Sequence, residues 1–206
     1  MEKTELVFAT ANPNKVKEVE AKLGGEIPLR GLPDIGCHEE VPETSPTIEG
    51  NAIQKARYVS ENYHVDCFAD DTGLEVYALN NEPGVLSARY AGDHKNSSDN
   101  IDLLLRNLEN KENRSARFRT VICLIMQGKE YLFEGIVEGT IIGQRRGSDG
   151  FGYDPVFIPQ GETRTFAEMS LEEKNKISHR GRAMSALRDF ILNNGIAGNV
   201  RRSDSV

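Results

Sequence analysis

Several features that define other classes of protein are missing from this sequence. The cysteines, Cys37, Cys67 and Cys123, are odd in number, widely spaced and without a C-x-x-C pattern, which argues against a zinc site or a disulfide framework. No segment approaches the roughly 20 uninterrupted apolar residues of a membrane-spanning helix, and the first residues lack a secretory hydrophobic region. We therefore expect reduced, packed thiols, no membrane partner and a cytoplasmic location.

Positive charge is also scarce. Lys and Arg number 25 against 32 Asp and Glu, which gives a formal net charge of −7. Proteins that bind a nucleic-acid backbone usually carry a broad basic surface, so no nucleic-acid partner is expected. An anionic ligand would instead need a local basic site. The phosphate-binding pattern G-x-x-x-x-G-K-[ST] is absent as well.

The composition that is present fits one folded domain. The chain has 206 residues, of which 38% are apolar and 28% charged, as is ordinary for a globular protein. This length is sufficient to bury a sizeable core. We expect a single domain over residues 1–195, followed by a polar tail over residues 196–206.

Hydrophobic periodicity predicts strands and helices in alternation and then a long β-hairpin. Strands are expected over residues 5–11, 27–32 and 65–69, and the hairpin pairs residues 116–126 with 130–142. Helices are expected over residues 14–23, from Ser45 and Pro46 to Tyr63, from Ser97 or Ser98 to Leu108, and after Ser170 and Ser178. The pattern predicts an α/β fold in which helices flank a mixed sheet.

The segment from Phe68 to Gly73 carries the strongest local indication of chemistry. An apolar run ends there in two adjacent acids, Asp70 and Asp71, followed by Thr72. Carboxylates at the end of a buried strand need a cationic partner, and paired carboxylates suit Mg²⁺, which binds alongside substrate phosphates. Neighbouring side chains of an extended segment point in opposite directions. We therefore expect one acid to ligate a metal or act as a base and the other to orient a ligand or backbone.

Two turns have compositions that suit a ligand. The turn Thr10–Lys15 lies between a predicted strand and helix, where free amides can bind an anion, although a plain connection fits its spacing equally well. The glycine-dense loop Gln144–Pro155 contains Phe151 and Tyr153. Their rings would either stack on a nucleobase or pin the loop to the core, and the residues alone favour the second interpretation.

Cationic side chains for a polyphosphate are available in these and later turns. The candidates are Lys15, Arg89, Lys174, His179 and Arg180. Taken singly, each is more often an ordinary surface residue, and a histidine at a helix end is often satisfied there. No Ser-His-Asp arrangement and no nucleophilic cysteine can be identified, so direct attack by water is favoured over a covalent intermediate.

Six motifs occur in the order found in one known family. They are A-T-A-N-P-N-K from Ala9, E-G-N-A from Glu49, A-D-D-T-G from Ala69, P-G-x-x-S-A-R-Y-A-G from Pro83, G-F-G-Y-D-P from Gly150 and E-E-K-x-x-x-S-H-R-G from Glu172. Through them the chain resembles, from end to end, the inosine triphosphate pyrophosphatases that act on noncanonical purine nucleotides. Each motif alone is weak, but their order is highly specific.

The resemblance implies hydrolysis of ITP, dITP and XTP to the monophosphate and pyrophosphate, with Mg²⁺, by a homodimer. It implies an elongated mixed α/β sheet between two lobes, with the substrate in a central cleft. Asp71 is implied as proton acceptor and metal ligand, and Glu43 is preferred to Glu39 and Glu40 as the second metal carboxylate. The implied substrate-binding residues are Thr10, Ala11, Asn12, Pro13, Asn14, Lys15, Thr72, Phe151, Gly152, Tyr153, Asp154, Lys174, His179 and Arg180.

Two alternatives to this function share the same phosphate-binding residues. A pyrophosphatase for modified pyrimidine or standard triphosphates would differ in its base pocket. A nucleotide sensor without catalytic activity would keep the basic site but would need no activated water.

Overall fold

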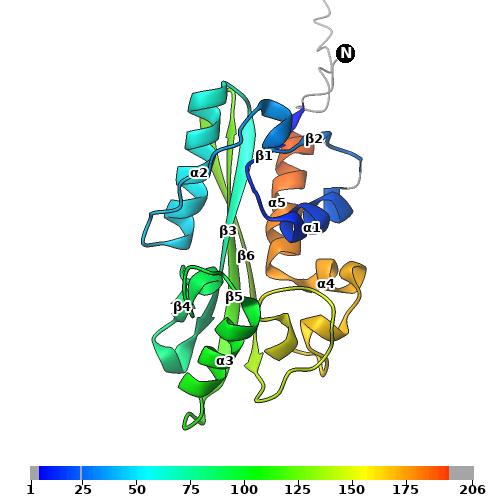
Figure 1. The fold of residues 1–206 in the computed structure, drawn as a ribbon. Coiled ribbons are helices and arrows are strands. Elements are labelled where there is room, and N and C mark those ends of the chain that lie inside the picture. The colour runs from blue at the N-terminus through cyan, green and yellow to red at the C-terminus, as the bar shows by residue number, and fades with distance from the viewer. Residues whose placement is uncertain (1–4, 24, 195–206) are drawn as a thin grey trace, which may run out of the picture.

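A seven-stranded sheet extends along the elongated molecule in the computed structural model, which describes residues 5–23 and 25–194 (Figure 1). The strand order is β2-β1-β3-β5-β6-β7, and β4 pairs with β3. β1 is parallel to β2 and β3, whereas the other pairs are antiparallel. The predicted mixed α/β fold is confirmed.

The elements follow one another with these bounds: β1 Leu6–Phe8, α1 Pro13–Leu23, β2 Leu29–Arg30, α2 Ile48–Tyr63, β3 Cys67–Val76, β4 Glu82–Gly84, α3 Ser97–Asn107, β5 Ser115–Met126, β6 Lys129–Ile141, β7 Phe157–Pro159, α4 Leu171–Ile177 and α5 His179–Asn193. Short 3₁₀ turns lie at Pro33–Ile35, Tyr77–Leu79, Ser87–Arg89, Asp154–Val156 and Phe166–Glu168. The predicted hairpin is confirmed as β5 and β6.

Helices cover both faces of the sheet (Figure 1). On one face α2 packs its small side chains, such as Ala52 and Ala56, against Ala69 of β3. On the other face, α1 and α5 bury an apolar cluster that includes Phe8 and Phe68, whose stacked rings are 4.5 Å apart. A third cluster joins α3 to the far halves of the long strands. The long strands therefore connect two lobes.

The predicted end of the strand at Ala69 is wrong. β3 continues to Val76, so Asp70 and Asp71 lie in the middle of a strand and pair with Ile122 and Val121 of β5. Their exposed fractions are only 1% and 9%. The strand continues through the two acids because buried cations from other elements lie against their carboxylates. An unpaired carboxylate would be costly to bury, and these ion pairs remove that cost.

Two predicted helix starts also need correction. Thr47, rather than Ser45 with Pro46, caps α2 by accepting a hydrogen bond from the Gly50 amide. Asn96, rather than Ser97 or Ser98, caps α3, because its side chain accepts hydrogen bonds from two first-turn amides.

The predicted starts of the last two helices are confirmed. Ser170 caps α4 in a capping box with Glu173, and Ser178 caps α5. Ser178 is both the C-cap of α4 and the N-cap of α5, so α5 begins directly where α4 ends.

A glycine in β6 determines how closely α5 approaches the sheet. A Cβ atom on Gly135 would lie 2.0 Å from the carbonyl oxygen of His179 and 2.6 Å from the amide of Ala183. Only a residue without a side chain fits this contact. Gly135 therefore allows the first turn of α5 to lie directly on β6.

Other predictions concern the thiols, the membrane and the tail. Cys37, Cys67 and Cys123 are free and buried, as expected. None of the helices within residues 5–23 and 25–194 is long and apolar enough to cross a membrane. The tail predicted over residues 196–206 lies outside the described residues.

Candidate active site

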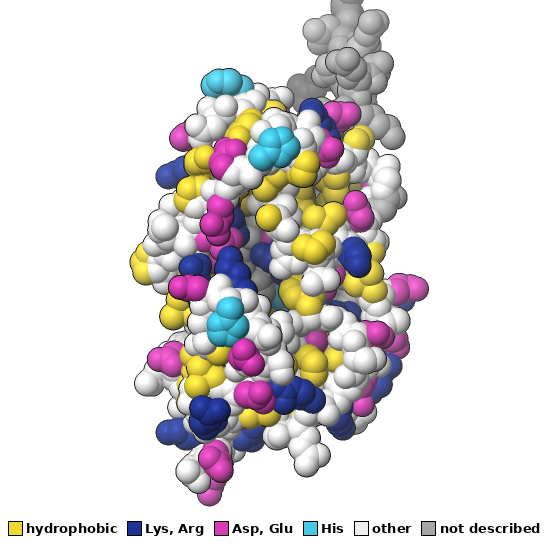
Figure 2. Space-filling view, viewed as in Figure 1, with side chains coloured by type: hydrophobic (Ala, Val, Ile, Leu, Met, Phe, Trp, Pro, Cys, Tyr) yellow, Lys and Arg dark blue, Asp and Glu magenta, His cyan; other side chains and the backbone are white. Residues whose placement is uncertain are grey.

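A cavity of about 510 Å³ lies between the two lobes and brings most of the predicted site residues together. The space-filling view shows a hollow at mid-height of one face, where Lys and Arg side chains gather beside Asp and Glu (Figure 2). The predicted residues in its lining are Thr10, Ala11, Asn12, Asn14, Lys15, Glu43, Asp71, Thr72, Phe151, Gly152, Tyr153, Asp154, Lys174, His179 and Arg180. Pro13 and Arg89 were also predicted but do not line it.

Asp71 faces the α2 side of the sheet. Its Oδ2 accepts a hydrogen bond of 3.2 Å from Asn51 Nδ2, and its Oδ1 lies 3.7 Å from Lys55 Nζ. Burial raises the pKa of Asp71, and nearby Glu43 and Asp70 add to that rise, although Lys55 and Lys15 oppose it. A carboxylate with a raised pKa is a stronger base than an exposed aspartate.

Asp71 and Glu43 both lie against one ammonium group. Lys55 Nζ is 2.5 Å from Glu43 Oε1, and the Arg89 guanidinium lies 3.9 Å from the other oxygen of Glu43. Within the described residues, no group of three or more His, Cys, Asp or Glu forms a candidate metal cluster. Two convergent carboxylates nevertheless fit Mg²⁺, which keeps several waters and takes further oxygen ligands from substrate phosphates.

Glu39 and Glu40, the other two candidates for the second metal carboxylate, have different surroundings. Glu39 accepts hydrogen bonds from the hydroxyls of Tyr58 and Tyr63. Glu40 has a side chain that is 90% exposed, and one of its oxygens lies 3.8 Å from Lys95 Nζ. Of the three candidates, Glu43 is therefore the one that meets the same cation as Asp71.

Asp70 points to the opposite face, as expected for a neighbouring strand residue. Its Oδ1 lies 3.0 Å from Lys15 Nζ, and its Oδ2 accepts a 3.0 Å hydrogen bond from Arg180 Nε. Burial opposes ionisation of Asp70, but these cations outweigh it and lower the pKa of the carboxyl group. Asp70 is thus a fixed anion that organises two basic side chains.

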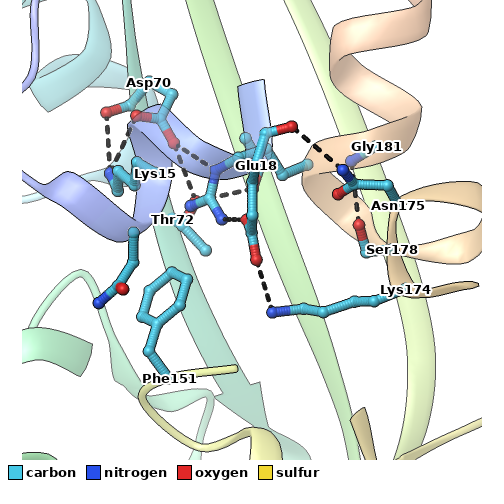
Figure 3. Close-up of polar contacts among 12 residues, drawn as sticks. Lys15, Glu18, Asp70, Thr72, Phe151, Lys174, Asn175, Ser178 and Gly181 are labelled. Carbon is cyan, nitrogen blue, oxygen red and sulfur yellow. Dashed lines mark hydrogen bonds and ion pairs between the residues drawn. The ribbon is translucent and has the colours of Figure 1, made fainter. Parts of the chain in front are cut away.

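Lys174 and Arg180 belong to a buried ionic network, and Figure 3 labels Lys174 together with Glu18 and Asp70. Lys174 Nζ lies 2.7 Å from Glu18 Oε1 and 2.6 Å from Asp154 Oδ2. Arg180 donates to Glu18 Oε2, to Asp70 and, over 2.9 Å, to Thr72 Oγ1. Each of the two cations is thus paired with two carboxylates of the protein.

His179 is not a cation, which corrects the prediction that counted it among the charges for phosphate. Burial, with Arg180 and Lys174 nearby, lowers its pKa well below the ordinary value. The neutral ring stacks on Phe118 at 4.5 Å. Within the described residues its buried Nδ1 has no hydrogen-bond partner.

The two aromatic residues of the glycine-rich loop have different roles. Tyr153 is buried and donates a 2.8 Å hydrogen bond from its hydroxyl to the carbonyl of Ser87, so it pins the loop to the core. Phe151 is half-buried at the cavity, with Lys174 Nζ 5.0 Å from its ring centroid and Arg180 Cζ 5.7 Å away. Only Phe151 remains available for stacking on a base.

The first turn of α1 is already capped. Asn12 Oδ1 accepts hydrogen bonds of 2.9 Å and 3.3 Å from the amides of Asn14 and Lys15. These amides were the predicted anion donors, and they are satisfied within the turn. The Lys15 ammonium, whose side chain is 13% exposed, is the cationic group that this turn presents to the cavity.

Comparison with known proteins agrees with the motifs. The model of the Ham1 family matches residues 6–190. The chain belongs to the Ham1 family. A relative from Flavobacterium psychrophilum, named dITP/XTP pyrophosphatase, is 57% identical over 92% of this chain and 100% of its own length. A relative of the same name from Porphyromonas gingivalis is 54% identical over 91% of this chain and 97% of its own. The resemblance inferred from the sequence is confirmed.

Solved structures of the Ham1 family share this fold. A Ham1 protein from Coxiella burnetii superposes with a TM-score of 0.85 at 37% identity, covering 92% of this chain and 98% of that protein. The Staphylococcus aureus Ham1 protein gives a TM-score of 0.84 at 37% identity, covering 92% and 99%.

Lys55 and Glu18 are two residues of this Ham1-family site that the sequence reasoning missed. The sequence contains one weak indication of each residue, namely a charged side chain within the apolar stripe of a helix. Lys55 lies between Ala52 and Ala56 on α2, and Glu18 precedes buried Val19 on α1. A long charged side chain at such a position usually reaches out to solvent, and here both remain buried because they meet opposite charges from distant segments.

Proposed function

We propose that this protein hydrolyses the noncanonical purine nucleoside triphosphates ITP, dITP and XTP to the nucleoside monophosphate and pyrophosphate, and so removes them from the nucleotide pool. The names of its close relatives support this assignment. The structural observation that carries it is one cavity in which Asp71, with a raised pKa, lies near Lys15 and Lys55, while Phe151 forms another part of the lining.

Asp71 is proposed as the proton acceptor. Water attacks the α-phosphorus in line with the leaving group, a new oxygen–phosphorus bond forms, and the bond to the bridging oxygen breaks to release pyrophosphate. The water proton passes to Asp71, whose burial favours the protonated form. Asn51 holds the carboxyl group in place through its hydrogen bond to Oδ2. Lys15 and Lys55 stabilise the negative charge of the phosphates.

Mg²⁺ is the proposed cofactor, held by Asp71 and Glu43. When bound, it would polarise a phosphoryl oxygen and lower the pKa of a bound water. Removal of divalent ions with EDTA is expected to abolish pyrophosphate release from ITP, and excess Mg²⁺ is expected to restore it. Unchanged turnover after complete chelation would contradict this cofactor.

Discrimination against adenine is proposed to depend on groups that only donate hydrogen bonds. Lys174 and Arg180 have no acceptor atoms, and both lie within 6 Å of the Phe151 ring. A purine stacked on Phe151 would meet them with its 6-oxo edge. The 6-amino group of adenine would set a donor against a donor, which is a strong basis for rejection.

A substrate panel tests the function. The protein is incubated with Mg²⁺ and ITP, dITP, XTP, ATP, GTP or dUTP, and the products are separated. Pyrophosphate and monophosphate from ITP, dITP and XTP are expected, with little product from the others. Orthophosphate as the first product would contradict the cleavage position. Preferred cleavage of dUTP or standard triphosphates would favour the pyrimidine or general pyrophosphatase, and binding without turnover would favour the sensor.

The partners follow from the same proposal. The substrate is a free nucleotide, so no nucleic acid or membrane partner is required, and the nucleotide pool of the cytoplasm is the proposed site of action.

A homodimer is proposed from the family resemblance. Sedimentation equilibrium is expected to give twice the 22.9 kDa mass of one chain, and a mass of one chain throughout the concentration range would refute the dimer.

A further inference from the structure

The segment that carries Glu43 has no regular structure of its own. Residues 36–47, all within the described part of the chain, form no helix or strand between the 3₁₀ turn Pro33–Ile35 and the start of α2. Backbone amides in such a segment need hydrogen-bond partners from elsewhere. The position of Glu43 is therefore set by contacts between its segment and neighbouring elements.

Two side chains of α2 hold the backbone directly after Glu43. The Thr44 amide donates a 2.8 Å hydrogen bond to Gln54 Oε1, and the Ser45 amide donates one of 2.8 Å to Asn51 Oδ1. Gln54 Nε2 in turn donates over 2.9 Å to Thr44 Oγ1. Gln54 and Thr44 thus form a reciprocal pair of hydrogen bonds, which fixes both the distance and the orientation of Thr44 relative to α2.

The same part of α2 holds the carboxylates proposed for the metal. Lys55, which follows Gln54, has its Nζ 2.5 Å from Glu43 Oε1, and Asn51 Nδ2 donates to Asp71 Oδ2. One helix therefore fixes the backbone beside Glu43 and the side chain of Asp71. Mg²⁺ requires near-ideal octahedral geometry with its oxygen ligands at about 2.1 Å, so the separation of two carboxylates matters for its binding.

Gln54 acts from outside the cavity. Among the described residues, Glu43, Lys55 and Asp71 line the cavity, whereas Gln54 and Thr44 do not. Gln54 is half-buried and Thr44 is exposed. Any effect of Gln54 on a bound metal must therefore pass through the position of Glu43.

We propose that Gln54 is a positioning residue for the metal, because it holds Glu43 at a separation from Asp71 that lets both carboxylates bind one Mg²⁺. This inference rests on the proposed function and its metal site. A carboxylate on a loosely held segment must be ordered when the metal binds, and that ordering weakens binding. The hydrogen bonds from Thr44 to Gln54 order the segment beforehand.

Gln54→Met tests the inference, because methionine keeps the length of the side chain but removes both hydrogen bonds. Mn²⁺ is the probe, and its dissociation constant for nucleotide-free protein is measured from the electron paramagnetic resonance signal of free Mn²⁺. This constant is expected to rise about tenfold or more. The Mg²⁺ concentration for half-maximal pyrophosphate release from ITP should rise in proportion, while kcat at saturating Mg²⁺ stays at the wild-type value.

Asn62→Leu is the matched control. Asn62 is an exposed amide near the end of the same helix, and its Nδ2 donates a 2.7 Å hydrogen bond to the carbonyl of Tyr58. The substitution likewise removes a side-chain hydrogen bond from α2 but leaves the Glu43 segment untouched. The dissociation constant for Mn²⁺ should therefore equal that of wild type.

Thr44→Val completes a double-mutant cycle with Gln54→Met. It removes the hydroxyl acceptor but keeps the backbone amide, so a smaller rise in the Mn²⁺ dissociation constant is expected, about threefold. Added to Gln54→Met, Thr44→Val should cause no further loss, because the hydroxyl has already lost its partner. Independent losses that multiply in the double variant would overturn the inference.

A wild-type dissociation constant for Mn²⁺ in Gln54→Met would also overturn it, whatever the change in the free energy of unfolding measured with urea. If Gln54→Met does not fold, Thr44→Val alone decides: a rise of about threefold supports the inference, and wild-type affinity overturns it. Wild-type protein that binds no Mn²⁺, or whose turnover is unaffected by EDTA, would refute the proposed metal site itself, independently of the variants.

Discussion

Asp70 and Asp71 are adjacent in β3, yet their carboxyl groups have opposite electrostatic surroundings. Lys15 and Arg180 meet Asp70 on one face and lower its pKa, whereas burial dominates at Asp71 on the other face and raises its pKa. The alternation of side chains along a strand is the cause. One acid is thereby kept ionised as an organiser, and the other is suited to accept a proton.

Asp71→Asn is expected to abolish pyrophosphate release from ITP while the protein stays folded, because an amide cannot accept the proton of the attacking water. Turnover is measured by product separation and folding by circular dichroism. Asp93→Asn is the control, since Asp93 is exposed and does not line the cavity. Wild-type-like turnover by Asp71→Asn would refute the assignment.

The electrostatic surroundings of Glu18 predict that the free energy of unfolding changes at acidic pH. Burial opposes its ionisation, but Arg180 and Lys174 outweigh this effect and lower the pKa of Glu18 below its ordinary 4.5. Because its pKa is lowered in the folded protein, the ionised Glu18 carboxylate stabilises the fold at pH values above its unfolded-state pKa. This stabilisation is lost as the pH falls from 4.5 through the folded-state pKa. The gap in unfolding free energy between wild type and Glu18→Gln, measured with urea, should narrow over that range. A gap independent of pH would contradict this electrostatic role.

At the scale of the elements, the site depends on how α5 meets the sheet. The capped start of α5 lies directly on β6 at Gly135, and this contact places His179 and Arg180 at the cavity. The ring of His179 is then fixed by stacking on Phe118 of β5. Gly135, which does not line the cavity, thus determines the position of two residues that do.

Gly135→Ala is expected to lower the unfolding free energy by about 1–3 kcal/mol, because the new methyl group would overlap the backbone of α5. The KM for ITP should rise as well, since His179 and Arg180 must shift with the helix. Gly143→Ala is the matched control: a Cβ atom there has no neighbour within 4 Å. Urea unfolding and steady-state kinetics check both variants, and equal behaviour of the two would contradict the close-contact argument.

At the scale of the whole molecule, the shared long strands bring the two lobes to one cavity. On the α2 side of the sheet, the packed apolar side chains bury the cysteine thiols. Cys67 and Cys123 belong to the cluster between α2 and the sheet, and burial raises the pKa of each to about 12. These cysteines are therefore held as neutral thiols.

Folded protein is expected to resist alkylation at Cys67 and Cys123 at about pH 8, where a free thiol of pKa about 8.5 reacts readily. After unfolding in urea, both should be modified. Peptide mass spectrometry after treatment with iodoacetamide measures the extent at each cysteine. Rapid labelling of Cys67 in the folded protein would show that this core opens easily.

The sequence by itself determined the local features of this protein. Periodicity located most strands and helices, and the six motifs indicated the family and most of the residues that line the cavity. These features are readable because helical and strand periods, caps and turn residues act over a few neighbouring positions.

Only the tertiary structure decided which charges neutralise one another. The partners of Glu18 lie 156 and 162 positions away, at Lys174 and Arg180. Such pairs follow no sequence spacing, because they form wherever the packed sheet and helices bring opposite charges together out of water. This is why the strand was predicted to end at Asp70 and Asp71, while in the fold both acids meet buried cations and β3 continues through them.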